Sequence, residues 1–240
     1  MDYNKNELPV SFLKYKGFLG HLRLGWLKLR SMVVIHGFLK AVNLMKGNFF
    51  LVQLLYRMEG KISDIAQPLA LSRGLRFGRI STIDSLLEWN YLPDLVRLRG
   101  SFGLTQAQMR LSYGYMLLYA CIDESLAGFM WLAASDSFEA GYRMEAHEKY
   151  YLDALTFPQF RGRGIFPKLI QYLAGTLRDT ASSVDNLVAH AVRVNKAAIA
   201  AQRKAGMRIA ELEVSIVFLG FHRKYRLRTY HAADSLACIF

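Results

Sequence analysis

The chain has 240 residues, enough for one sizeable domain and an appendage, and 52% of them are hydrophobic, which excludes a disordered chain. Its two cysteines, Cys121 and Cys238, have no metal-like or CxxC spacing and are too few for a disulfide framework. We therefore expect both thiols to be reduced and the protein to be cytoplasmic. The formal net charge is +12, and residues 1–75 carry 11 lysines and arginines against 4 acidic residues.

The first region, residues 1–74, is a basic amphipathic segment. Residues 8–58 contain no acidic residue, and their lysines and arginines are interleaved with large apolar side chains. Apolar residues such as Val33, Phe38 and Val42 recur at helical spacing, which predicts an appendage of two or three short helices. Its uncharged runs are well short of the roughly 20 residues of a spanning helix, and the opening residues lack the order of a signal peptide, so no transmembrane segment is predicted.

The second region, residues 75–225, has the element order of an α/β (α+β) domain. A polar hydroxyl at 81–82 predicts the start of one helix, and Thr105 predicts the cap of a second. We expect a mixed, mostly antiparallel central sheet flanked by helices, with residues 226–240 as a C-terminal tail. The predicted strands are 75–80, 116–122, 126–134, 150–156, 187–194 and 213–219, and two later helices are predicted from 165 and over 195–204.

A glycine-rich loop, Gln159-Phe160-Arg161-Gly162-Arg163-Gly164, follows one of these strands and precedes a helix. The unpaired backbone N–H groups at a helix start lie at the positive end of the helix dipole, which suits a pyrophosphate. The two glycines allow a tight turn and a close approach of the backbone, and the two arginines supply charge-assisted hydrogen bonds. An ordinary strand-to-helix turn is the alternative interpretation.

This loop and a downstream segment resemble the GNAT acyltransferases. Residues 159–164 match the family's Q/R-x-x-G-x-G/A signature in full. Residues 195–198 (Asn-Lys-Ala-Ala) and 204–207 (Lys-Ala-Gly-Met) are similar to the family's Asn-x-x-Ala helix and the Gly-Phe pair that ends it. The resemblance covers roughly residues 75–222 and implies a GNAT fold with acetyl-CoA as the acyl-donor cosubstrate and no metal.

The resemblance also implies roles for particular residues. The loop amides would bind the CoA pyrophosphate, Asn195 would contact the pantetheine arm or CoA, and the strand before the loop would splay from its neighbour to hold the thioester in a V-shaped slot. A backbone amide near Leu155 or Thr156 would polarise the thioester carbonyl. The implied cofactor-binding residues are Leu155, Thr156, Gln159, Arg161, Gly162, Arg163, Gly164, Ile165, Phe166 and Asn195.

The acid and base of the reaction are less directly indicated. Many family members have a tyrosine acid seven residues after the motif asparagine, where this chain has Gln202, and an amide cannot titrate. Met207 replaces the usual phenylalanine. We therefore consider the nearby strand residues Asp153 and Glu148 as candidate bases and Tyr151 as a candidate acid.

The structural alternatives for these residues are an ion-paired carboxylate and a packed tyrosine. His190, in the middle of a predicted strand, fits a hydrogen-bonded core histidine better than a proton shuttle.

Four interpretations of the basic residues 10–57 stay open. Their helices could pack on the acyltransferase domain with solvated lysines, or lie on an anionic membrane surface as a peripheral anchor. They could instead dock an acidic partner such as an acyl carrier protein. Nucleic acid is the fourth, and no helix-turn-helix, zinc or stacking motif supports it.

Two classes of function follow for the whole chain. The first is an acyl-CoA-dependent N-acyltransferase that moves an acetyl group to a primary amine of a small molecule, amino sugar or peptide, with a carrier-protein donor as a variant. The second is a non-catalytic CoA-binding or membrane-associated scaffold, motivated by Gln202 and the basic appendage.

Overall fold

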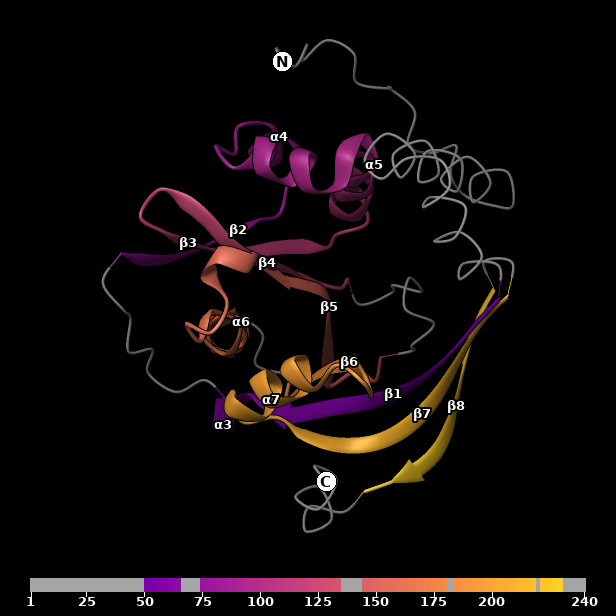
Figure 1. The fold of residues 1–240 in the computed structure, drawn as a ribbon. Helices are drawn as coiled ribbons and strands as arrows, with labels where there is room; N and C mark the ends of the chain where they lie inside the picture. The colour runs from indigo at the N-terminus through magenta and orange to yellow at the C-terminus, as the bar shows by residue number, and fades with distance from the viewer. Residues whose placement is uncertain (1–49, 66–73, 135–143, 181–183, 219–220, 231–240) are drawn as a thin grey trace.

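A computed structural model of the chain describes residues 50–65, 74–134, 144–180, 184–218 and 221–230 (Figure 1). Within them, eight strands form one sheet in the order β2-β3-β4-β5-β6-β1-β7-β8. The strands are β1 (Phe50–Lys61), β2 (Leu75–Ile80), β3 (Met116–Ile122), β4 (Ser125–Leu132), β5 (Glu148–Thr156), β6 (Asn186–Val192), β7 (Arg208–Phe218) and β8 (Phe221–Thr229). The helices are α3 (Ile62–Ile65), α4 (Ile83–Leu87), α5 (Leu92–Ser112), η2 (Pro158–Phe160), α6 (Ile165–Thr180) and α7 (Lys196–Lys204).

The sheet is mixed and mostly antiparallel. Every neighbouring pair of strands is antiparallel except β5 and β6, which run parallel and are joined by α6. A parallel pair needs such a crossover, whereas β3 and β4 form a hairpin through residues 123–124. The predicted fold class is therefore confirmed.

Helices cover both faces of the sheet, and each face has its own core. In Figure 1, α4 and α5 lie on one side of β2, β3 and β4, and α6 lies on the other. The core on the α6 side includes Leu169, Leu173 and Met58, and the core on the α5 side includes Leu104 and Phe129. Because side chains alternate along a strand, consecutive residues of β5 enter different cores.

The helical appendage was predicted to extend to residue 74, and this is wrong for residues 50–61. These residues form β1, which lies inside the sheet between β6 and β7. Tyr56 and Met58 are buried in the α6-side core, whereas Arg57 and Glu59 belong to the opposite face. That two-residue period is typical of a strand. The predicted helices of residues 1–49 lie outside the described residues.

The predicted boundary at residue 225 is also wrong. β8 continues the sheet to Thr229, and Tyr230 is buried against the α6-side core, where its ring meets the ring of Tyr56 edge-on. The last strand predicted from the sequence corresponds to β7, and β8 was not predicted. Residues 231–240 lie outside the described part of the chain.

The helices after β2 confirm one predicted cap and contradict the other. Thr82 caps α4, and its side-chain oxygen accepts a hydrogen bond from the Ser85 amide. Thr105 lies inside α5, where its hydroxyl donates to the Ser101 carbonyl. The break in this helix occurs instead at Gly100, whose φ of 64° is not helical. Glycine reaches this conformation without steric cost.

Candidate functional site

The glycine-rich loop connects β5 to α6 by a short turn. A single 3₁₀ turn, η2, is followed by Gly162 and Gly164, whose φ angles are +77° and +69°. Both values lie in the left-handed region that favours glycine. A Cβ atom built on either glycine would meet no atom within 4 Å. The glycines are therefore required by backbone conformation, and the space in front of them is open.

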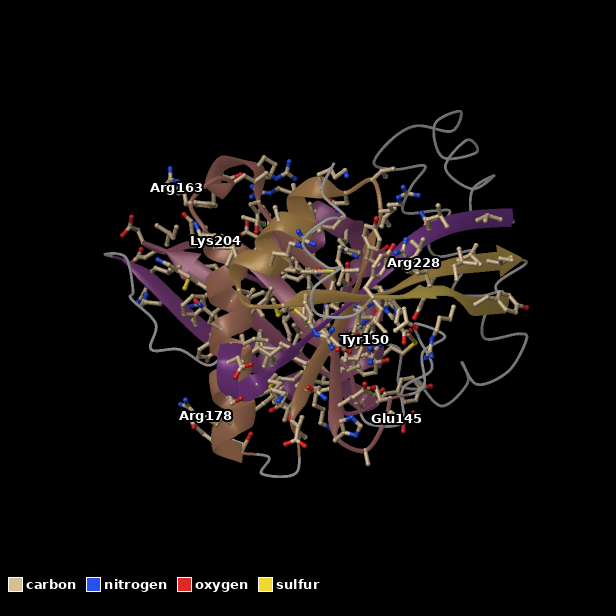
Figure 2. The ribbon with its side chains drawn as sticks, turned by 90° about the horizontal axis from the view of Figure 1, so that it is seen from below. Glu145, Tyr150, Arg163, Arg178, Lys204 and Arg228 are labelled. Carbon is tan, nitrogen blue, oxygen red and sulfur yellow. The ribbon has the colours of Figure 1, made fainter. Side chains whose placement is uncertain are left out.

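That open space is part of a hollow of about 370 Å³ at the start of α6. Its lining includes both glycines and three side chains with positive charge. Arg163 comes from the loop and Lys168 from the first turns of α6, while Lys204 comes from the end of α7. Figure 2 shows Arg163 and Lys204 at one end of α6, with Arg178 at the other. Unpaired helix amides together with these cations fit a pyrophosphate.

The strand that leads into this loop, β5, separates from its neighbour β6. β5 and β6 pair only from Glu148 to Tyr150, opposite residues 186–188. Beyond that point β5 keeps its pairing with β4, whereas β6 keeps its pairing with β1 as far as Val192. The two strands therefore separate after Tyr150. This is the V-shaped slot that the resemblance implied.

A β-bulge shapes the β5 side of the slot. The register with β4 shifts between the Trp131–Leu152 pair and the Phe129–Leu155 pair, so β5 carries one extra residue there. Within this bulge Asp153 has a φ of +52°, a conformation that aspartate tolerates better than most residues.

Two arginines of α5 hold the bulge. The Asp153 carboxylate accepts hydrogen bonds from Arg99 at 2.5 Å and from Arg110 at 2.7 Å. Both carboxylate oxygens are thus engaged by guanidinium groups. This disfavours Asp153 as a base and indicates that it fixes the bulge.

The backbone after the bulge has the orientation expected for a carbonyl-binding amide. The Phe157 amide donates to Ala127 of β4, so by alternation the amide and carbonyl of Thr156 point away from β4, toward the slot. The Arg161 side chain donates to the Thr156 carbonyl at 3.3 Å. By the same alternation, the amide and carbonyl of Leu155 point toward β4, where Leu155 lies opposite Phe129. Of the two residues predicted for this role, Thr156 fits.

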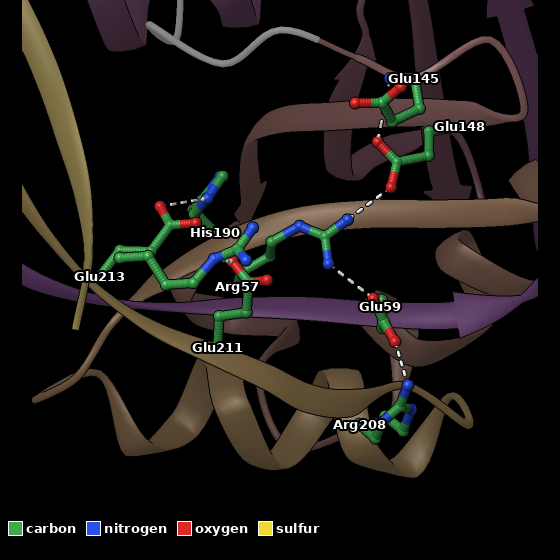
Figure 3. Close-up of polar contacts among 9 residues, drawn as sticks. Arg57, Glu59, Glu145, Glu148, His190, Arg208, Glu211 and Glu213 are labelled. Carbon is green, nitrogen blue, oxygen red and sulfur yellow. Dashed lines mark hydrogen bonds and ion pairs between the residues drawn. The ribbon is translucent and has the colours of Figure 1, made fainter. Parts of the chain in front are cut away.

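The second candidate base, Glu148, lies at the closed end of the slot in an ion-pair network (Figure 3). Its side chain is 5% exposed and accepts from Arg57 at 2.5 Å, while its other oxygen accepts from the Glu145 amide. Arg57 also pairs with Glu59, which pairs in turn with Arg208. A buried carboxylate held by a guanidinium is a structural partner, which disfavours Glu148 as a base.

The third candidate, Tyr151, lies beside the residue that occupies the family's acid position. Its hydroxyl donates to the Met207 sulfur at 3.3 Å, and Gln202 of α7 is a hydrogen-bonding neighbour. Burial raises the pKa of the Tyr151 phenol well above its usual value of 10.0. The hydrogen bond from Gln202 lowers this pKa, but by less than burial raises it. The side-chain oxygen of Gln202 is buried without a hydrogen-bond partner among the described residues. The structure thus brings a protonated phenol to the place where the sequence has no acid.

The burial of Tyr151 predicts that the folded protein loses stability at alkaline pH. In the unfolded chain Tyr151 ionises near pH 10.0, whereas burial opposes its ionisation in the folded protein. The contribution of Tyr151 to the free energy of unfolding is therefore full below pH 10 and is lost as the pH rises above 10. In urea titrations between pH 8 and 11, we expect the wild type to lose up to about 1.4 kcal/mol per pH unit relative to Tyr151→Phe above pH 10. Tyr113→Phe, at an exposed position, is the control and should retain the wild-type slope. Parallel curves for the wild type and Tyr151→Phe would contradict the prediction.

The remaining predicted residues are dispersed around the hollow and the slot. Gln159 is exposed on η2, Ile165 is buried at the first position of α6, and the Phe166 ring packs edge-on against Tyr151. Asn195 caps α7, and its side-chain oxygen accepts from the Ala198 amide. It is separated from Lys204 by the length of α7, about 13 Å, so it does not line the hollow.

Sequence reasoning missed Lys168 and Lys204. A lysine in the last turn of a helix usually balances the helix dipole, so Lys204 carried no separate signal. Only the packing of α7 beside α6 brings it to the loop.

None of the described helices is long and apolar enough to cross a membrane. The described ranges also hold no group of three or more His, Cys, Asp or Glu residues that could bind a metal.

Comparisons with known proteins identify the fold of the chain. No protein-family model matches the chain, and no curated protein matches it. Among solved structures, a functionally unknown conserved protein from Staphylococcus epidermidis is 11% identical, with a TM-score of 0.51 over 74% of this chain and 66% of that one. A tandem GNAT protein from the clavulanic acid biosynthesis pathway is 12% identical, with a TM-score of 0.50 over 80% of this chain and 59% of that one. The chain thus spans less than two thirds of either structure. The chain therefore has the fold of this tandem GNAT protein, a GNAT fold.

Proposed function

We propose that the chain is an acyl-CoA-dependent N-acyltransferase that moves an acetyl group from acetyl-CoA to a primary amine. One observation carries the proposal: β5 separates from β6 after Tyr150 and then leads directly into a loop whose glycines and cations fit a pyrophosphate. A thioester in the slot and a pyrophosphate in the hollow are the two ends of one elongated donor. The small molecule, amino sugar or peptide that carries the amine is the acceptor.

The residues present fit this donor. The amides from Arg161 to Phe166 would hold the pyrophosphate, together with Lys168 and Lys204. The Thr156 amide would polarise the carbonyl that accepts the amine's electron pair. Bound acetyl-CoA supplies the activated acyl group, and the chain supplies position and proton transfer.

Tyr151 is the acid in this proposal. Its raised pKa keeps the phenol protonated at neutral pH, so that it can stabilise or protonate the departing sulfur. It would replace the tyrosine that the family resemblance places at Gln202. Its hydrogen bond to Met207 is weak, because a thioether sulfur is a poor acceptor, and can be exchanged for one to the sulfur of the donor.

The direct test combines binding and turnover. Acetyl-CoA binding is measured by calorimetry, and thiol release is measured with acetyl-CoA and a panel of primary amines. Release that depends on the amine supports the acyltransferase. Tight CoA binding without release from any amine would favour the alternative, a non-catalytic CoA-binding scaffold, for which Gln202 is the motivating residue.

Lys204 provides a finer test of the pyrophosphate site. We expect Lys204→Ala to weaken CoA binding about five- to tenfold at low salt, because an exposed cation that lines the hollow contributes a charge-assisted contact of modest strength. The loss should shrink at high ionic strength. Lys61→Ala, on an exposed lysine at the end of β1, is the matched control and should bind CoA as the wild type does. Equal affinities for both variants would remove Lys204 from the site.

The partner of the basic N-terminal segment is a separate proposal. An anionic membrane surface and an acidic carrier protein both match its charge. Co-sedimentation of the full chain with anionic vesicles, but not with neutral ones, would support the peripheral membrane site.

A further inference from the structure

Two consecutive tyrosines lie at the point where the slot opens. Tyr150 is the last residue of β5 that pairs with β6, and Tyr151 is the first beyond it. Tyr151 belongs to the core on the α6 side and Tyr150 to the core on the α5 side. The two side chains therefore lie on opposite faces of the sheet. If Tyr151 is the acid, the base that takes the amine's proton is to be sought on the face where Tyr150 lies.

The side chain of Tyr150 is the first of a series of three buried polar side chains in contact with one another. Its hydroxyl lies 3.1 Å from His190 Nδ1, and His190 Nε2 lies 3.0 Å from an oxygen of Glu213. The side chains of His190 and Glu213 are only 5% and 8% exposed. The three residues come from β5, β6 and β7, so this series of side chains reaches across β1, which lies between β6 and β7 in the sheet. Figure 3 shows the His190–Glu213 contact.

The chemistry of these groups sets the direction of the hydrogen bonds. An ionised carboxylate only accepts, so Nε2 of His190 carries the proton that binds Glu213. Nδ1 is then the acceptor and takes the hydrogen bond from the Tyr150 hydroxyl. A hydroxyl bound to an imidazole that is itself oriented by a carboxylate is the arrangement that activates nucleophiles and bases in many enzymes.

We propose that Glu213, His190 and Tyr150 form a proton relay that serves as the general base for the amine acceptor. The inference rests on the proposed acyltransferase function and assigns the base that Asp153 and Glu148, both held by arginines, do not supply. Tyr150 is the residue that contacts the amine. His190 and Glu213 act through it and are positioning residues.

The charges around His190 are mixed. Glu213 favours the imidazolium, whereas Arg57 lies directly opposite His190 on β1 and disfavours it. The charge of Arg57 is already shared with Glu148 and Glu59, as Figure 3 shows. On the β7 side, Glu211 is paired with Arg226 of β8 at 3.0 Å. Glu213 is thus the carboxylate in contact with the imidazole, and it stabilises a proton there.

The proton transfers balance as follows. Tyr150 takes one proton from the acceptor ammonium while its own proton moves to His190 Nδ1. The neutral amine forms the C–N bond to the acyl carbon with its lone pair. The C–S bond breaks, and its electron pair leaves with the sulfur. Tyr151 donates its proton to the sulfur, which completes the thiol, and the second proton from the nitrogen returns Tyr151 to its protonated form. The relay returns its own proton to water.

The kinetic test uses the full chain, acetyl-CoA and the fastest amine of the panel. At pH 7 we expect Tyr150→Phe to lower kcat/KM about 100-fold and Glu213→Gln about tenfold, with CoA affinity unchanged. The deficit of Tyr150→Phe should narrow as the pH approaches the pKa of the amine, because solvent then supplies neutral acceptor. Tyr113→Phe, which removes an exposed hydroxyl at the end of α5, is the control. A twofold or smaller loss in Tyr150→Phe, or a loss that is equal at every pH, would overturn the relay.

A second readout needs no turnover. Nitrogen NMR of histidine-labelled protein, with His190 assigned from the spectrum of His190→Asn, should show the proton on Nε2 and a hydrogen-bonded, unprotonated Nδ1 at pH 7. Tyr150→Phe should shift the Nδ1 signal alone. A proton on Nδ1 would overturn the relay even if amines are acylated. If no amine is acylated, the proposed function fails, and the NMR result still decides whether the relay is oriented as a base.

Discussion

Gly164→Val is expected to lower the affinity for CoA by about 100-fold or more. The native φ of +69° is strongly unfavourable for a β-branched residue, so the loop must leave this conformation or place valine in the open hollow. In either case one or two charge-assisted hydrogen bonds to the pyrophosphate are lost, at about 1.5–3 kcal/mol each. Calorimetric titration with CoA measures the effect.

The control is a glycine of α6, the helix that follows the loop. Gly175 lies inside α6, and a Cβ there would also meet no atom within 4 Å. Gly175→Ala is expected to stabilise the protein by about 0.5–1 kcal/mol and to leave CoA binding unchanged, because alanine favours the helical conformation. Wild-type affinity in Gly164→Val would show that the loop does not bind the donor. Equal losses in both variants would point to a general effect on α6.

The sequence was most informative where a function depends on local backbone. The loop from Gln159 to Gly164 is such a case, since a glycine at a left-handed position and a following helix are both visible in the residues themselves. Most strands and helices from Leu75 to Phe218 were predicted close to their observed bounds for the same reason, whereas α5 begins 13 residues before the predicted cap at Thr105 and β7 begins five residues before the predicted strand. A hydroxyl cap at Thr82 and a polar turn at 123–124 are local signals.

The features that the sequence did not reveal depend on contacts between distant strands. β1 was hidden because its apolar residues continue a long basic and apolar segment, and its place between β6 and β7 depends on strands more than 100 residues away. The bulge at Asp153 arises from a register shift against β4. The hydrogen bonding and burial predicted for His190 are confirmed, while the proposed relay departs from the prediction that this residue is not a proton shuttle. Its partners could not be named, because Tyr150 and Glu213 meet it only across the sheet.

Arg57→Met is expected to give the largest loss of stability among the variants considered. It leaves the buried carboxylate of Glu148 without the guanidinium that now lies 2.5 Å away. Removing one member of a buried ion pair typically costs about 3–5 kcal/mol, because the remaining charge stays in a poorly solvated place. For a chain of this size that corresponds to a fall in Tm of roughly 10 °C, measured by calorimetry or circular dichroism.

The double variant Arg57→Met/Glu148→Leu separates the value of the pair from the cost of an unpaired charge. We expect it to recover most of the lost Tm, since replacing both members of a buried pair by apolar residues is often neutral or stabilising. Arg178→Met, at an exposed pair with Asp179, is the control and should barely change Tm. If Arg57→Met is as stable as the wild type, the network is not a buried constraint on β1 and β5. The closed end of the slot would then be held by backbone pairing from Glu148 to Tyr150 alone.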